Sequence, residues 1–572
     1  MAFRGFTSAS MPQPETERQT VEMNHLEDME LGEDSKQSKE ISDHDNFKLS
    51  VGGQLVFLTL SVLTLMVALD GTSISVALPK ISLELHGLAM EAFWSGTSFL
   101  LCSTVFQPTT ATLSNIFGRR PVLFVSLTFF SIGSLLAGIA KNFTDILIGR
   151  CIQGVGGGGI AVLSEIIVTD LVPLRLRGRY YGILSAMYSV GSVLGPILGG
   201  GFSEKASWRW IFYINFPFIG IGGFLVVFFF RLPTPKGSLH QKLACVDWTG
   251  AVLFIGSVSA VLIPISWGGI MHAWSSWRTV VPLSVGAAGL VAFCIWEVLL
   301  VSTEPMIPPD IFRNRSATIA LATSFLQGLN LWCALYYLPL YYEAVRGFGP
   351  ILTGVALFPE TFTIAPAAIF CGLIVTATGH YRWGLWVGWS ISAMGAGLLC
   401  LLEVDTPTVA WIFLNVPGGI GIGILTAALV CAVQASATRH NLTASVAMVV
   451  FFRSFGQAVG IAVGGVVFQN RMRHHLQGYV DLAPRADELA RDAAALVTTM
   501  RGMTDEMAKA HLKQAYTDSL RAIWAVCCGI SGVGLALSVF VKKYDLNRAL
   551  KSDSDEEESD KKKEQEEDDQ VT

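Results

Sequence analysis

The most constraining feature of this chain is a series of long apolar segments separated by polar loops. A bilayer core about 30 Å thick is spanned by about 20 helical residues, because each residue adds about 1.5 Å along the helix axis. About fourteen segments reach this length. They lie near residues 52–76, 92–113, 121–140, 146–170, 179–201, 208–231, 247–267, 278–301, 316–341, 351–376, 383–402, 409–433, 444–468 and 520–541. Since a backbone in lipid must satisfy its polar groups internally, these segments predict an all-α polytopic membrane protein.

Composition excludes several other classes of protein. Charged residues make up 15% of the chain and hydrophobic residues 51%, whereas about a quarter of the residues in soluble proteins are charged. The net charge is −5, and no Lys/Arg cluster is interleaved with aromatic residues, so no nucleic-acid partner is expected. The sequence has no Gly-x-Ser-x-Gly elbow, no Walker loop and no His/Cys ligand spacing. We therefore expect neither an enzyme nor a bound metal or cofactor.

Basic residues in the loops predict the orientation in the membrane. Cytoplasmic loops carry an excess of Lys and Arg, and this bias places both termini on the cytoplasmic side. The tails, 1–48 and 542–572, are acidic or densely charged, and such composition predicts disordered segments. Residues 469–519 would then form a loop outside the cell. This loop contains several arginines, but long loops cross a membrane largely regardless of charge.

Two motifs place arginine at or inside the apolar segments. The short loop after the second segment contains Gly118, Arg119 and Arg120. Such a basic loop either pairs with acidic groups and helix ends of a neighbouring bundle, latching one conformation, or is a simple positive-inside anchor. The fourth segment contains Arg150, Gln153 and Gly154, followed by more glycines. An arginine inside a membrane helix is costly and usually faces a partner or a polar cavity, unless it reaches the interface.

Two further motifs lie in the fifth and first segments. The fifth segment contains Gly191, Gly195, Pro196, Gly199 and Gly200. Pro196 removes one helix hydrogen bond and the glycines remove side chains, so this helix can kink and pack closely on another. In the first segment Asp70 is the only acidic residue. A carboxylate inside a membrane indicates a functional site that can bind and release protons.

With these residues the chain resembles the major facilitator superfamily, and within it the fourteen-helix drug:proton antiporter branch in a form similar to fungal members. The similarity covers residues 50–541. The matching motifs are 70–79 in helix one, 115–120 between helices two and three, 150–156 in helix four, 191–200 in helix five, 208–217 in helix six and 453–456 in helix thirteen. The loop motif usually has Gly and Asp where this chain has Ala111 and Asn115, so a charge relay through that Asp is not expected here.

The resemblance implies a major facilitator fold with two six-helix bundles, 49–231 and 315–541, the second including an outside loop near 469–519. The linker region 232–314 would hold two extra helices. Alternating access would arise from rocking of one bundle against the other. The implied function is proton-coupled efflux of amphipathic small organic molecules, such as a fungal toxin or a drug, by a multi-pass protein that is a monomer in the plasma membrane.

Three carboxylates are candidates for carrying the proton: Asp70, Glu165 and Glu360. Asp70 ranks first because of its motif, and Arg150 is its expected charge partner. Arg453 is interpreted as a packing anchor of helix thirteen. Several aromatic residues could line a substrate pocket, although Trp and Tyr near helix ends more often lie at the membrane–water interface. These residues are Trp332, Tyr336, Tyr337, Tyr341 and Tyr342.

Other functions stay open at this point. Fourteen-helix relatives include proton-coupled siderophore importers and vacuolar transporters of basic amino acids, and the vacuolar membrane is the alternative location. The antiporter motif in helix five weighs against a symporter. A receptor or regulator that does not transport would work through its charged tails. Asn142 begins an Asn-Phe-Thr sequence, a possible glycosylation site that lies so close to the membrane that we expect it to be unused.

Overall fold

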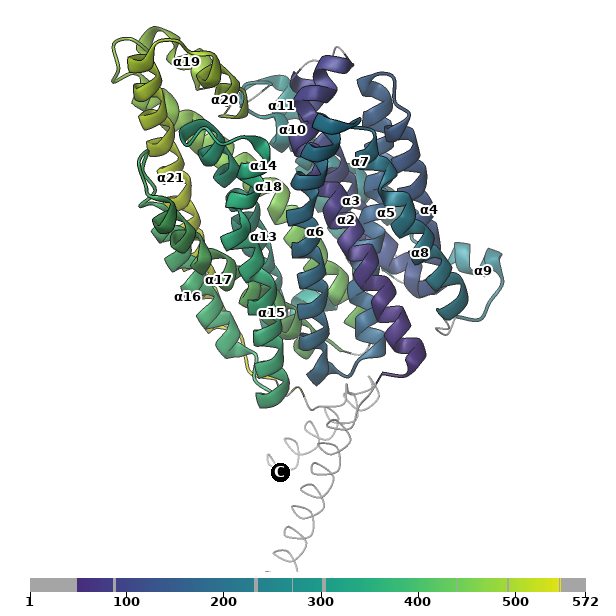
Figure 1. Cartoon of the computed structure of the whole chain (residues 1–572). Helices are drawn as coiled ribbons and strands as arrows, with labels where there is room; N and C mark the ends of the chain where they lie inside the picture. The colour runs from purple at the N-terminus through teal and green to yellow at the C-terminus, as the bar shows by residue number, and fades with distance from the viewer. Residues whose placement is uncertain are drawn as a thin grey trace, which may run out of the picture. The chain divides into compact units, whose positions relative to one another are not determined.

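The structure is a computed structural model that describes residues 49–546, apart from 86–88, 231–234, 270, 301–304, 439, 491–492 and 545. The predicted N-terminal tail lies outside this range, as does nearly all of the C-terminal tail. In the described part the long helices run roughly side by side (Figure 1).

The N-terminal half contains helices at the first six predicted segments. They are α2 (Val51–Glu84), α3 (Ala89–Phe117), α4 (Arg119–Gly138), α5 (Phe143–Leu171), α6 (Arg177–Lys205), α7 (Trp210–Tyr213) and α8 (Asn215–Phe229). The sixth segment is split into α7 and α8 because Pro217 has no backbone N–H to continue the helix. Ser50 caps α2 and Asn142 caps α5, each through a side-chain oxygen that accepts a backbone N–H.

The middle of the chain contains two long helices and two short ones. They are α9 (Leu239–Ala244), α10 (Trp248–Trp267), α11 (Trp277–Ile295) and α12 (Asp310–Arg313). Helix α11 ends in a π-helical turn, Trp296–Leu300. Helices α10 and α11 pack on each other, and α10 also contacts α3 and α18. The extra pair therefore contacts helices of both halves of the chain.

The C-terminal half contains the remaining helices. They are α13 (Arg315–Leu340), α14 (Pro350–Ala356), α15 (Phe358–Thr378), α16 (Arg382–Leu399), α17 (Thr408–Ser436), α18 (Leu442–Leu476), α19 (Ala486–Leu489), α20 (Ala493–Gly502) and α21 (Glu506–Val539). A π-helical turn, Tyr341–Val345, follows α13. The ends of the predicted outside loop, 469–519, are helical, since α18 and α21 extend into it from either side.

The first residues of the predicted disordered tail are packed against the protein. The Tyr381 hydroxyl donates to the Lys542 carbonyl over 2.9 Å, and the Lys542 N–H donates to Ser316 Oγ over 3.0 Å. Tyr544 contacts Asn314 through its hydroxyl at 3.1 Å. Composition does not reveal these contacts, and the boundary at residue 542 stays a prediction.

Twelve helices in the described residues are long and apolar enough to cross a membrane. Among the predicted segments, α3 and α16 fall outside this group: α3 carries a run of Thr and Ser, and α16 is short and rich in Gly and Trp. The number fourteen therefore stays a prediction, as does the division into two six-helix bundles. The two halves of the chain are joined by hydrogen bonds between the start of α6, with the turn before it, and the ends of α15 and α17.

Candidate functional site

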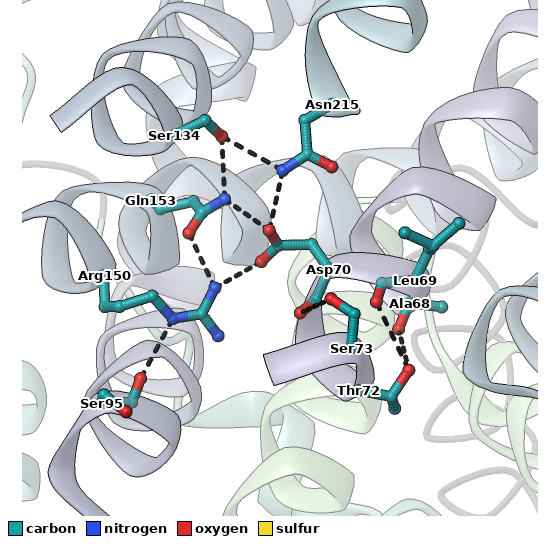
Figure 2. A network of polar contacts seen from close by, with 10 residues as sticks. All are labelled: Ala68, Leu69, Asp70, Thr72, Ser73, Ser95, Ser134, Arg150, Gln153 and Asn215. Atoms are coloured by element: carbon teal, nitrogen blue, oxygen red, sulfur yellow. Dashed lines mark hydrogen bonds and ion pairs between the residues drawn. The ribbon is translucent and has the colours of Figure 1, made fainter. Parts of the chain in front are cut away.

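Asp70 lies at the centre of a buried polar network formed by α2, α3, α4, α5 and α8 (Figure 2). Its Oδ2 accepts a hydrogen bond from Arg150 Nη1 at 2.5 Å, and both side chains are fully buried. Its Oδ1 accepts from Gln153 Nε2 at 2.8 Å and from Asn215 Nδ2 at 2.7 Å. Ser134 Oγ accepts from Gln153 Nε2 at 2.8 Å. The predicted pairing of Asp70 with Arg150 is thus present in the geometry.

Removing either member of the Asp70–Arg150 pair is expected to destabilise the protein strongly. A buried ion pair gains little over an apolar pair, but loss of one partner leaves an uncompensated charge and costs about 3–5 kcal/mol. Arg150 Nε also donates to the Ser95 carbonyl at 3.1 Å. Its Nη2 has no hydrogen-bond partner among the described residues. The guanidinium therefore depends on Asp70 for its only contact with an opposite charge within this network.

A cavity of about 180 Å³ lies between helices of the two halves. Most of its lining is apolar or carries hydroxyl and amide groups, and its charged lining residues in the described chain are Glu165 and Arg453. Asp70 and Arg150 do not line it, although Gly71 and Thr72, the residues that follow Asp70, do.

Glu165 and Arg453 form an ion pair in the lining of this cavity. Arg453 Nη2 lies 2.5 Å from Glu165 Oε1, and the pair joins α5 to α18. Glu165 Oε2 is buried without a hydrogen-bond partner in the described residues. The packing interpretation of Arg453 also fits, because a Cβ on Gly328 would lie 2.0 Å from the Arg453 carbonyl oxygen. That close backbone contact fixes the helix from which the guanidinium reaches Glu165.

Glu360 lies apart from both groups. It is in the first turn of α15 and is 1% exposed. Its Oε2 has no hydrogen-bond partner in the part of the chain that the structure describes. It does not line the cavity that contains Glu165. The structure therefore brings Asp70 together with Arg150 and Glu165 with Arg453, and among the described residues it forms no ion pair with Glu360.

The glycine motif of α6 faces helices of both halves. A Cβ added at Gly191, Gly195 or Gly199 would lie between 2.0 and 2.5 Å from an oxygen atom of α2. Pro196 faces α14, since a Cβ on Gly354 would be 3.5 Å from it. Gly200 lies between α14 and α2, since a Cβ there would be 3.4 Å from side-chain carbons of both Ile351 and Val76. The motif thus permits close approach on one side and contact across the halves on the other.

One end of the cavity is closed by hydrogen bonds between the halves. Arg175 Nε donates to the Thr376 carbonyl at 2.8 Å. Arg177 Nη1 donates to Gln434 Oε1 at 3.0 Å, and Gln434 Nε2 donates to the Tyr181 hydroxyl at 2.7 Å. We call this the inner end, because its loops carry the basic residues that predict a cytoplasmic position. The bonds join α6 and the turn before it to α15 and α17.

Arg119 supplies another contact at the inner end. Its Nε pairs with Asp170 at 2.9 Å, and its Nη1 donates to Ser114 Oγ at 2.7 Å and to Asn115 Oδ1 at 2.5 Å. Its Nη2 donates to Thr443 Oγ1 at 3.0 Å, at the start of α18. Asp170 thus provides the carboxylate that Asn115 cannot. Sequence reasoning missed Asp170, since it lies at the far end of another helix.

The other residues of this loop have local roles. Gly118 has φ +97°, a left-handed conformation that favours glycine, and it is the residue before α4. Arg120 Nη2 donates to the Val227 carbonyl at 2.6 Å, on α8 of the same half. Gly154 lies against α3, since a Cβ there would be 2.6 Å from the Phe99 carbonyl oxygen. Residues of both the loop motif and the helix-four motif therefore contact neighbouring helices of the same half.

Arg119→Ala is expected to slow transport several-fold, whereas Arg120→Ala leaves the rate near that of the wild type. The reason is that Arg119 bonds to both halves and Arg120 bonds within one half only. The rates are measured in vesicles, together with the labelling of a cysteine introduced at the inner end. Labelling is expected to rise for the Arg119 variant alone. Equal effects of the two substitutions would contradict this role of Arg119.

The aromatic candidates of α13 separate into two groups. Trp332 lines the cavity, as the pocket hypothesis requires. Tyr337, Tyr341 and Tyr342 are buried in the core of the C-terminal half instead, and Tyr336 packs partly buried against the same core. In the turn before α5, Asn142 Oδ1 accepts the Asp145 N–H at 2.8 Å. The cap uses Oδ1, whereas glycosylation would modify Nδ2, so the modification state of Asn142 stays a prediction.

Comparison with known proteins identifies similar chains. A family model described as Major Facilitator Superfamily matches residues 60–244. "MFS transporter L2" of a Phoma species is 50% identical over 491 residues, which cover 86% of this chain and 82% of that protein. "Acurin A biosynthesis cluster MFS-type transporter" of Aspergillus aculeatus is 37% identical and covers 87% and 91%. "Efflux pump FUS6" of Gibberella fujikuroi is 34% identical and covers 87% and 90%.

A solved structure shares the same fold. The chain is similar to the proton:xylose symporter XylE, with a TM-score of 0.54 and 13% sequence identity. The match covers 87% of this chain and 97% of that one. At this level of identity the comparison concerns the arrangement of helices alone.

Proposed function

Because the chain belongs to the major facilitator superfamily, we propose that it exports amphipathic small organic molecules in exchange for protons. The observation that carries this proposal is the Asp70–Arg150 pair, buried beside a cavity that both halves line. A relative named as an efflux pump and one named for a biosynthesis cluster support export of a fungal metabolite. The mixed apolar and amide lining of the cavity suits an amphipathic molecule.

In this proposal Asp70 carries the proton. The Asp70 carboxylate gains three donors when it is ionised, and Arg150 holds its charge. A proton on Asp70 removes that charge and favours a different arrangement of α2 and α5. One proton that crosses down a potential of 100 mV supplies about 2.3 kcal/mol, before any pH gradient is added. Glu165 and Arg453 would open and close with the two halves, since their bond spans them.

Alternating access then requires the inner-end bonds to break in one state. The contacts of Arg175, Arg177 and Arg119 hold the inner end shut in this conformation. Substrate would enter from the cytoplasm after these bonds separate, and would leave when they form again. We propose that the protein acts in the plasma membrane, which the export hypothesis favours. We also propose that it acts as a monomer, because the cavity and both charged pairs are formed within one chain.

The test is substrate-linked proton movement in everted vesicles. A panel of amphipathic drugs and fungal metabolites is added to vesicles with an acidic interior, and uptake and proton release are followed together. We expect at least one compound to accumulate only when the gradient is present, with protons moving the opposite way. Accumulation with protons moving in the same direction would indicate a symporter, and no movement of any compound would favour a receptor.

A further inference from the structure

Phe99 of α3 lies between the Asp70 network and the cavity. Its ring is 3% exposed and forms part of the cavity lining. On the other side, the Arg150 guanidinium carbon lies 4.3 Å from the ring centroid. Because neither Asp70 nor Arg150 reaches the cavity lining, the same ring contacts the cavity and covers the charged pair.

The ring is seated in a slot made by glycines. A Cβ on Gly157 would lie 3.0 Å from Phe99 Cζ, and one on Gly71 would lie 3.6 Å from Cε1. Gly71 belongs to α2 and directly follows Asp70, and Gly157 belongs to α5, two turns beyond Arg150. The slot therefore connects the two helices that carry the charged pair, and a larger residue at Gly157 would press on the ring.

We propose that Phe99 couples occupancy of the cavity to the proton on Asp70, an inference that rests on the proposed function. With the ring seated, Arg150 keeps a cation–π partner even when Asp70 is neutral, so Asp70 can hold a proton. A substrate that moves the ring removes this partner and admits water. Arg150 then needs the ionised carboxylate, and the proton leaves Asp70.

This coupling makes the binding of substrate and the binding of a proton oppose each other, as an antiporter requires. Substrate and proton exclude each other, because the substrate favours the displaced ring and the proton favours the seated ring. Arg150 is the charged group that contacts Asp70 within the described residues, and the other contacts come from the uncharged Gln153, Asn215 and Ser73. From α3, the group that faces Arg150 beside the ring is the Ser95 carbonyl. Phe99 is thus a positioning residue that acts through Arg150.

The experiment uses purified protein in liposomes that contain a pH-sensitive dye, with an imposed pH gradient and no substrate. Phe99→Ala is expected to collapse the gradient several-fold faster than the wild type, since water reaches Asp70 without substrate. Asp70→Asn added to Phe99→Ala is expected to return the leak to the wild-type rate. Phe99→Leu fills the slot but offers no ring to Arg150, so its leak is expected to lie between those of the wild type and Phe99→Ala.

A structural effect of the substitution would give a different pattern. A leak that persists in the Phe99→Ala/Asp70→Asn double variant, or a Phe99→Ala protein as tight as the wild type, overturns the inference. If Phe99→Ala does not fold, Phe99→Val is used with the same expectation. The wild-type vesicle screen tests the proposed function separately: coupled transport there together with a tight Phe99→Ala variant refutes only the role of Phe99.

Discussion

Asp70→Asn is expected to reduce proton-driven transport to background. Asparagine has the shape of aspartate but binds no exchangeable proton at this position, so the coupling step is lost. It also leaves Arg150 as a buried cation without a counter-charge, which costs about 3–5 kcal/mol of folding stability. Transport is measured in everted vesicles, and stability is measured by thermal unfolding of the detergent-purified protein.

A double variant separates the loss of coupling from the loss of stability. Asp70→Asn combined with Arg150→Met removes both charges, and such replacement of a buried pair is often neutral for stability. We expect the unfolding temperature to recover while transport stays at background. The control is Asp310→Asn, because Asp310 is an exposed carboxylate paired with Arg313 at 3.0 Å. It is expected to transport like the wild type, since exposed pairs contribute about 0–1 kcal/mol.

If gradient-driven transport persists in the Asp70→Asn variant, another carboxylate must carry the proton. Glu165 would then be the first alternative, because it lines the cavity and is paired with Arg453. Glu360 would be the second, as a buried carboxyl that lies outside the cavity lining. Recovery of transport in the double variant would show that the pair is structural.

The helical segments followed from the sequence because lipid imposes a simple length rule, whereas the family fold was implied by the motif resemblance. The segment predicted at 146–170 corresponds to α5, Phe143–Leu171, and the one at 409–433 corresponds to α17, Thr408–Ser436. The expected family and fold are confirmed by the comparisons. Hydropathy locates the part of a helix that lies in lipid, but polar turns extend beyond it. For this reason α21 begins at Glu506, well before the segment predicted from 520.

The candidate site was predictable only in part. Asp70 and Arg150 could be paired in advance because a membrane charge needs a partner and few are present. Asn215 stood in a quoted motif, yet its bond to Asp70 spans 145 positions of sequence and no local pattern predicts it. The Glu165–Arg453 bond spans 288 positions. Such contacts depend on how helices rotate against one another, which hydropathy does not determine.

Gly199→Ala is expected to be among the most disruptive small substitutions in the chain. A Cβ at this position would lie 2.1 Å from the Ser73 carbonyl oxygen and 2.9 Å from its carbonyl carbon. Both atoms are backbone, so no side-chain rotation relieves the clash and α6 must move away from α2. Overpacking of this kind costs about 1–3 kcal/mol. Ser73 Oγ donates to the Asp70 carbonyl at 3.2 Å, so the shift reaches the turn of α2 that contains Asp70.

Gly201→Ala is the matched control on the same helix, because nothing lies within 4 Å of a Cβ at that position. Alanine has a higher helix propensity than glycine by about 1 kcal/mol, so this variant is expected to be as stable as the wild type or slightly more stable. Unfolding temperature and transport rate are compared for the two variants in the same preparation. Opposite signs of the stability change indicate that contact with α2, rather than glycine flexibility, is what the motif requires. A Gly199→Ala protein that behaves like Gly201→Ala would instead assign the motif to bending of α6 at Pro196, where the helix already lacks one backbone donor.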